Sequence, residues 1–336
     1  MSGMTKIKDI AQGLLNRNPN PIQYVIITRD LLGVPISDRQ LIEAIDKSNC
    51  HRWVRELEEA QETNGTWGRF HSQDSSLKKK FPTTENAVNR ALSLGLTTES
   101  SILRKAVSFM SGMISGVESW SDRVEKFNEW PITTKMITAS VLSRVNRIHP
   151  ALDSVWELWA KITESAFENG GHNLTRELNA FEEITGIRST KRDSKLNKLY
   201  PLILLSATKN NLSSETEKAY LEWIWDYNEG IYYLTWFSLN TFPEITSKAF
   251  PFWLRAIDIF SDFSYGKTLA KDSVNYLWSL RDKDGLWDFG KYSKSAGYAK
   301  TSCGWQLSED WRDSINRQLD CTLRILLLLK KHSEQG

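Results

Sequence analysis

One seven-residue frame recurs near opposite ends of the chain, as Gln61-Glu-Thr-Asn-Gly65-Thr-Trp67 and as Arg281-Asp-Lys-Asp-Gly285-Leu-Trp287. Each copy begins with a long polar residue, reaches a glycine four positions later and ends on a tryptophan two positions after that. A glycine in this place indicates a turn that needs a positive φ or a close approach of the backbone. The two copies therefore predict one structural unit that occurs twice.

The composition favours a single large α-helical domain. The chain has 336 residues, of which 40% are hydrophobic and 25% charged, so it can bury a core without metals or disulfides. Only nine prolines and 18 glycines interrupt it, which suits helices joined by short loops. Strict alternation of polar and apolar residues persists nowhere, so strands are not expected.

Apolar residues at helical spacing predict a series of helices. A capping box at Ser37 and Gln40 opens one of them, with Ser37 as the N-cap. A polar loop follows each frame, over residues 69–82 and 288–313, and loops of this length are often functional. The predicted helices span 21–32, 53–60, 85–94, 101–116, 130–145, 151–168, 196–207, 213–225, 232–239, 250–260, 273–280 and 316–331.

Helix pairs that repeat at roughly 40 to 50 residues suggest an α-solenoid or a closed toroid. The two frames resemble the QW repeat of the terpenoid cyclase and protein prenyltransferase superfamily, which includes squalene-hopene cyclase. The resemblance implies an (α/α) toroid, an α/α barrel of paired inner and outer helices, over residues 51–332, with N-terminal helices in 1–50 packing on it. In that superfamily the glutamine amide packs against the tryptophan indole.

Charge, cysteine content and hydropathy restrict the classes of partner. The net charge of +2 gives no basic field that would favour nucleic acid. Three cysteines with no CxxC spacing indicate neither a disulfide framework nor a zinc ribbon. Neither a signal peptide nor a transmembrane segment is expected, so the sequence predicts a cytoplasmic protein.

The superfamily's catalytic motifs are missing from this sequence. It has no Asp-x-Asp-Asp segment for protonating an alkene, no Asp-Asp-x-x-Asp cluster for magnesium, and no Asp-x-Cys element for zinc. An enzyme of this kind would therefore need a non-standard catalytic acid. No metal site or cofactor is predicted, although magnesium would accompany a diphosphate substrate.

The second polar loop supplies the first set of candidate site residues. Asp310 or Asp313 could act as a general acid or base. Helix capping by Ser308, with acidic residues in the first turn, explains the same loop without any site. The other candidates are an anion grip formed by Arg312 and Arg317 and an apolar wall formed by Trp305 and Trp311.

The first polar loop supplies the second set. His71, Asp74 and the lysines 78–80, with Lys80 as the chosen candidate, could meet a diphosphate together with Arg312 and Arg317 if the two ends of the chain lie side by side. A solvated surface loop explains the lysine run equally well.

An aromatic stretch in the middle of the chain supplies the third set. Trp223, Trp225, Tyr227, Tyr232, Tyr233, Trp236 and Phe237 lie within 15 positions, in a chain that has 14 tryptophans. Core packing accounts for such a stripe, but it could also wall an apolar cavity, with Trp236 in contact with substrate. Asp226 and Glu229 would then be buried carboxylates, and Asp226 a catalytic group with a raised pKa.

Three functions remain open. The first is an isoprenoid-handling enzyme related to terpene cyclases or prenyltransferases, acting on an apolar or prenyl diphosphate substrate. The second is a non-catalytic toroid that binds a lipid-like ligand or a protein partner. The third is a carbohydrate-active (α/α) barrel, in which tryptophans stack on sugars and an acid pair such as Asp310 and Asp313 performs hydrolysis.

Overall fold

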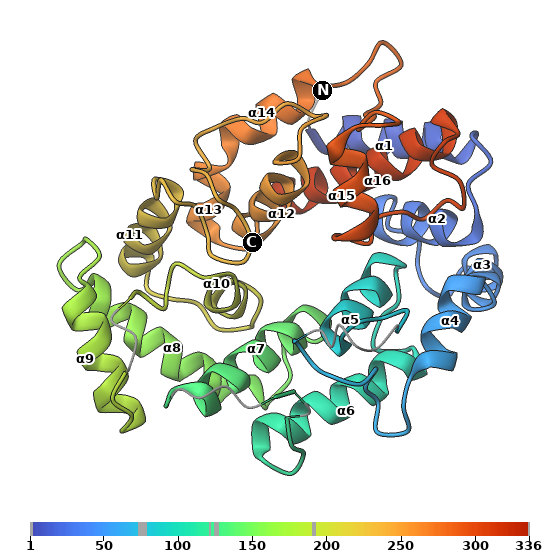
Figure 1. Ribbon diagram of the computed structural model, residues 1–336. Coiled ribbons are helices and arrows are strands. Elements are labelled where there is room, and N and C mark those ends of the chain that lie inside the picture. Colours follow the sequence, from blue (N-terminus) through green and yellow to red (C-terminus); the bar gives the residue numbers. More distant parts are fainter. Residues whose placement is uncertain (1–2, 73–78, 121, 124–127, 190–192, 335–336) are drawn as a thin grey trace.

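The computed structural model describes residues 3–72, 79–120, 122–123, 128–189 and 193–334 (Figure 1). Within these ranges the regular structure is helical, apart from one isolated parallel bridge between Lys198 and Tyr232. The expectation of an all-α protein is confirmed. No helix in the described ranges is long and apolar enough to cross a membrane.

The described helices follow the predicted ones over most of the chain. The π-helical turn η1 directly continues α2. Their bounds are α1 (Gly3–Leu15), α2 (Pro21–Val25), η1 (Ile26–Leu31), α3 (Arg39–Asn49), α4 (Arg52–Ala60), α5 (Thr84–Ser93), α6 (Ser101–Ser115), α7 (Trp130–Val145), α8 (Leu152–Phe167), α9 (Leu174–Thr185), α10 (Leu199–Ser206), α11 (Ser214–Trp225), α12 (Phe250–Phe260), α13 (Ser264–Leu269), α14 (Lys271–Ser279), α15 (Lys294–Thr301) and α16 (Ser314–Ser333).

One series of helices forms a continuous chain of contacts. Helix α5 packs on α7, α7 on α10, α10 on α12, and α12 on α16. Other helices pack beside this series, with α6 against α7 and α8 against both α7 and α10. Figure 1 shows the elements following one another around a circuit that brings α1 beside α16, and these two helices are in contact.

The two sequence frames adopt the same local structure. The indole of Trp67 donates to the carbonyl of Leu57 at 2.8 Å, and that of Trp287 donates to the carbonyl of Leu277 at 2.7 Å. Each carbonyl lies ten residues before its tryptophan, near the end of the preceding helix. Gly65 and Gly285 have φ of 91° and 78°, as the turn requires.

The backbone of each frame tryptophan is also fixed by a threonine. The amide of Trp67 donates to the Thr84 hydroxyl at 3.0 Å, and the amide of Trp287 donates to the Thr322 hydroxyl at 3.1 Å. Gln61 donates to the carbonyls of Gly65 and Ile102 at 3.0 and 2.9 Å. Each frame therefore ties the end of one helix to a later one, which explains its recurrence in structural terms.

Asp320 joins the two ends of the chain. Its carboxylate, 1% exposed, accepts from the Leu307 and Ser308 amides at 2.7 and 2.8 Å. It also accepts from the Trp311 indole and from the Gln23 amide on α2, both at 2.6 Å. Because every one of these donors is itself buried, the carboxylate holds α2, α16 and the loop before α16 together.

Several sequence-based boundaries are wrong. Residues 232–239 are not helical, because Tyr232 exchanges backbone hydrogen bonds with Asn197 and Leu199 instead. Asp38, not Ser37, caps α3, and Asp313, not Ser308, caps α16. The supposed loop 288–313 contains α15, and the predictions missed α1, α9 and α13, which are amphipathic or very short.

Replacing Trp287 with Phe should destabilise the protein more than replacing Trp253 with Phe. Both side chains are fully buried, so both variants lose similar volume. The Trp287 variant also leaves the Leu277 carbonyl without its indole donor, whereas the Trp253 indole nitrogen has no partner among the described residues. Urea unfolding should show an extra loss of about 1 to 3 kcal/mol for W287F. Equal losses would show that the indole hydrogen bond does not stabilise the frame.

Replacing Asp320 with Asn should cost about 1 to 3 kcal/mol of unfolding free energy, because the amide oxygen can keep the three N–H groups that donate to Oδ2 only by turning its NH2 group toward the Gln23 amide, which donates to Oδ1. The matched variant is Asp313→Asn, since asparagine caps helices as well as aspartate does. Its stability should stay within about 0.5 kcal/mol of the parent. Similar stabilities for the two variants would exclude the proposed role of Asp320.

Candidate functional site

One cavity among the described residues is walled by aromatic side chains. It has a volume of about 820 Å³ and lies among α7, α8, α9, α10 and α11, with the segments 193–198 and 227–233 at its edge. The aromatic residues that line it, apart from its histidines, are Trp130, Trp159, Phe181, Tyr200, Trp223, Tyr227, Tyr232 and Tyr233. Such a wall accepts an apolar ligand or faces a cation with its π-electrons.

A histidine paired with a carboxylate lies at one side of this cavity. His71 lines the cavity, and its Nδ1 is 2.8 Å from Oε2 of Glu85 in the first turn of α5. The hydroxyl of Tyr200 on α10 donates to Glu85 at 3.0 Å and lies 3.0 Å from the same Nδ1. Glu85 thus orients the imidazole, and Nε2, which has no hydrogen-bond partner among the described residues, is the nitrogen available to a ligand.

The backbone that carries His71 is held by a second carboxylate. Asp122 accepts from the amides of Phe70, His71 and Ser72 at 3.1, 3.0 and 3.0 Å. Asp122 is 6% exposed, and burial raises its pKa while the three amides act in the opposite direction. Three successive amides converging on one carboxylate fix the path of the chain just after the first frame.

The environment of His71 favours its protonated form. Burial by itself would lower the pKa of His71, but the hydrogen bond and charge of Glu85, together with the charge of Asp122, raise it above the ordinary value of 6.5. Burial and then the nearby Glu85 raise the pKa of Tyr200 well above its usual range, so the phenol keeps its proton and remains a donor. The arrangement is suited to proton transfer at Nε2.

Two further polar pairs line or border the cavity. Nε2 of His172 lies 2.6 Å from fully buried Glu177, and the His172 ring stacks on Trp223 with centroids 4.0 Å apart. Nζ of Lys195 lies 3.5 Å from Glu129 and 5.0 Å above the Phe181 ring. Burial lowers the pKa of Lys195, although Glu129 acts against this.

Two features of the cavity wall indicate a binding role. Tyr233, which packs edge-on to His71 at 5.9 Å, has a φ of 70°, a conformation that costs a bulky residue about 1 to 3 kcal/mol and is concentrated at functional sites. The indole nitrogen of Trp159 is buried and has no partner among the described residues. A ligand with an acceptor atom could satisfy it.

Of the ten candidate residues chosen from the sequence, only His71 lines this cavity. Asp226 follows α11, accepts from the Asn240 amide at 2.7 Å and borders an adjoining pocket, but it is exposed. Glu229 lines the cavity and is exposed as well. The expectation that these two carboxylates are buried is wrong, because both lie in the irregular segment after α11, where their side chains are exposed.

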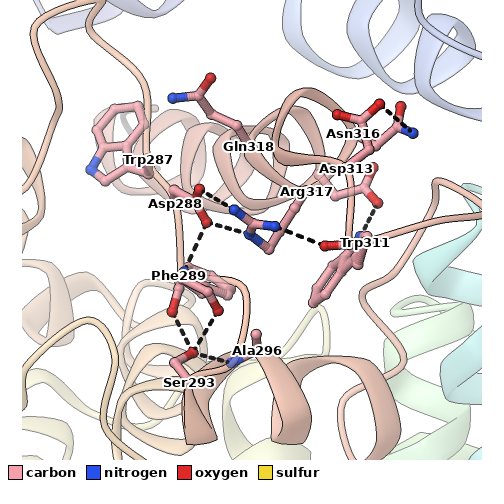
Figure 2. A network of polar contacts seen from close by, with 12 residues as sticks. Trp287, Asp288, Phe289, Ser293, Ala296, Trp311, Asp313, Asn316, Arg317 and Gln318 are labelled. Atoms are coloured by element: carbon pink, nitrogen blue, oxygen red, sulfur yellow. Dashed lines mark hydrogen bonds and ion pairs between the residues drawn. The ribbon is translucent and has the colours of Figure 1, made fainter.

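Three candidates in or next to the loop before α16 are engaged by other parts of the protein. Arg317 is 4% exposed, forms a two-pronged ion pair with Asp288 at 2.7 Å for both contacts, and donates to the Trp311 carbonyl (Figure 2). Its guanidinium is thereby already paired, contrary to the expectation that it grips a substrate anion. Trp305 and Trp311 are buried in the main core.

The remaining candidates lie at the surface. Asp310 and Arg312 are exposed, and the Asp310 carboxylate accepts from the Arg312 amide at 2.8 Å. Asp313 is the exposed N-cap of α16. Lys80 pairs with Glu56, and Trp236 is 51% exposed with Lys248 above its ring. Asp74 and Lys78 lie outside the described residues.

Sequence reasoning missed Glu85, Tyr200, Asp122, His172 and Lys195. Glu85 and Tyr200 are 115 positions apart in the chain, so no local pattern connects them. His172 follows two glycines, but Glu177, its partner, was visible five positions later in the next helix. A search for histidines near carboxylates at helix starts could have found this second pair.

Comparisons of the chain with protein-family models, with curated proteins and with solved structures found no match. The described residues contain no group of three or more His, Cys, Asp or Glu that could hold a metal ion.

Replacing Glu85 with Gln should lower the pKa of His71, because the hydrogen bond and charge that raise it are weakened. The parent pair contributes stability that is fully present below pH 6.5 and is lost as the pH rises through the raised pKa, since the folded protein then releases the proton. NMR titration of the imidazole, assigned with a His71→Asn variant, measures the pKa. An unchanged value in E85Q would contradict the pairing.

Proposed function

We propose that this protein is an enzyme that handles an isoprenoid in the aromatic cavity, with His71 as its acid–base group. The observation that carries the proposal is the position of His71, which lines a cavity of about 820 Å³ while its Nδ1 is held 2.8 Å from Glu85. An aromatic wall and an imidazole oriented by a carboxylate suit a reaction that passes through a carbocation.

The chemistry assigned to His71 is removal of a proton from a cationic intermediate. A carbon next to the cationic centre loses its proton to Nε2, and the electrons of that C–H bond form the new double bond. The resulting imidazolium is stabilised by Glu85, whose carboxylate is already at hydrogen-bond distance from Nδ1.

The aromatic side chains would stabilise the cation before it loses its proton. Trp130, Trp159 and Trp223 all line the cavity, and a π-face attracts a nearby positive charge by about 0.5 to 2 kcal/mol. Lys195 and Lys198, at the edge of the cavity, would favour the diphosphate end of a prenyl substrate. Magnesium carried by that diphosphate belongs to the same proposal.

The (α/α) toroid and its extent over residues 51–332 are also part of this proposal. The contact series α5, α7, α10, α12 and α16 supports assigning these five as inner helices, with α4, α6, α8 and α11 outside them. The N-terminal segment 1–50 would then brace the closure, since α1 and η1 pack on α16. A cytoplasmic location is proposed with it.

A second candidate is a binding protein that retains an apolar ligand without changing it. Tyr232 and Tyr233 are 57% and 60% exposed while they also line the cavity. Exposed aromatic rings at a cavity edge suit capture of an apolar molecule or contact with a protein partner. A carbohydrate-active barrel is less well supported, because the acid pair Asp310 and Asp313 lies outside the cavity.

Incubation of the protein with prenyl diphosphates and with squalene, with and without magnesium, tests the proposal when products and retained material are analysed by mass spectrometry. A cyclised or transferred product is expected, and His71→Asn should reduce its rate by about 10²-fold or more. The matched control His149→Asn, at the start of α8 and outside the cavity, should keep the parent rate.

Retention of unaltered ligand would favour the binding protein. If the protein yields no product and retains no ligand, both candidates are contradicted. Equal rates for the two histidine variants would exclude His71 as the acid–base group.

A further inference from the structure

A second, smaller pocket lies where the five helices of the contact series converge. It has a volume of about 280 Å³ and takes lining residues from α5, α7, α10, α12 and α16. It shares no lining residue with the aromatic cavity, so it is a separate site. Its charged lining residues are the cations Arg144, Arg147, Arg255 and Lys331 and the carboxylates Asp258 and Asp262, which leaves two positive charges in excess.

The ion pairs in this pocket leave two particular arginines without a carboxylate partner. Lys331 lies 2.6 Å from Asp262 and 3.4 Å from Asp258. Arg147 is paired with Asp262 at 2.9 Å, and Arg324, just outside the pocket, reaches Asp258 at 3.3 Å. Both carboxylates are therefore already shared among other cations.

Arg144 and Arg255 carry the excess charge. Among the described residues, Arg144 donates only to the neutral side chain of Asn89 on α5. Arg255 is half-buried and makes no hydrogen bond or ion pair with any described residue. The guanidinium groups of Arg144 on α7 and Arg255 on α12 thus line one pocket without a carboxylate partner among the described residues, and two such like charges repel each other unless a ligand supplies negative charge.

The electrostatics of Arg144 agree with this geometry. Burial, followed by the positive charge of Arg255, lowers the pKa of Arg144 to about 10, and Arg324 acts in the same direction. Asp258 and Glu85 act against it, but Asp258 is shared with Lys331 and Arg324, and Glu85 is engaged by His71 and Tyr200. The internal carboxylates do not remove the excess positive charge.

We infer that this pocket binds a phosphate-class dianion, held between the guanidinium groups of Arg144 and Arg255. A phosphoryl group offers several acceptor oxygens to the planar forks of two arginines, and its double negative charge equals the excess of two positive charges in the pocket. A volume of about 280 Å³ accommodates free phosphate, pyrophosphate or the phosphoryl end of a small ester. The inference does not depend on the reaction proposed for the aromatic cavity.

The test is isothermal titration calorimetry of the intact protein with inorganic phosphate, pyrophosphate and glycerol 2-phosphate, each compared with acetate at equal ionic strength. Binding of at least one phosphate compound is expected, and which of them binds distinguishes a free ion from an ester. No binding of any phosphate compound, or equal binding of acetate, would overturn the inference.

The variant Arg255→Gln should weaken phosphate binding by about tenfold or more. Its thermal midpoint without ligand should equal or exceed that of the parent, because an unpaired cation has been removed, so weaker binding cannot be ascribed to misfolding. The control Arg39→Gln removes the same charge from a 92% exposed side chain on α3 and should leave the affinity unchanged. Parent-like affinity in R255Q, or equal weakening in R39Q, would also overturn the inference.

Discussion

The buried carboxylate of Asp320 closes the molecule, because it accepts hydrogen bonds from the loop before α16 and from Gln23 near the other end of the chain. These contacts keep α16 beside the N-terminal helices, and α16 is also the last member of the helix series that begins with α5. The two sequence frames act more locally than Asp320, since each indole donates a hydrogen bond to a carbonyl near the end of the preceding helix. The first frame also lies shortly before His71 in the chain and is hydrogen-bonded to Thr84, the neighbour of Glu85, so it helps to place this pair.

Polar groups whose hydrogen bonds are all made within the protein can be told apart from those that could bind a ligand. Arg317 and Asp320 are buried and fully engaged by neighbours, so the polar loop before α16 is accounted for without a ligand. His71 differs, because only one side of its imidazole is held by protein. Arg144 and Arg255 differ as well, since neither forms an ion pair with a carboxylate of the described residues. The two pockets are distinguished by polar groups that lack a hydrogen-bond or ion-pair partner among the described residues, and not by the density of charged residues in the sequence.

Local patterns in the sequence predicted the all-α class and most helices, because apolar spacing and the two frames are short-range signals. They failed for 232–239, where aromatic residues at helical spacing instead form an irregular segment paired with residues 197–199. His71 could be chosen because it follows a frame. Its partners could not, since Glu85 on α5 and Tyr200 on α10 are 115 positions apart in the chain and meet only in the folded protein. Asp310 and Asp313 were chosen for local charge density, which reflects helix capping and an exposed turn.

A crystal structure with a non-hydrolysable prenyl diphosphate analogue would test the central claim most directly. The claim predicts that the isoprenoid chain occupies the space between Trp130, Trp159 and Trp223, with one of its carbons within contact distance of Nε2 of His71. An analogue bound elsewhere, such as beside Asp310 and Arg312, with the aromatic cavity left to solvent, would contradict it.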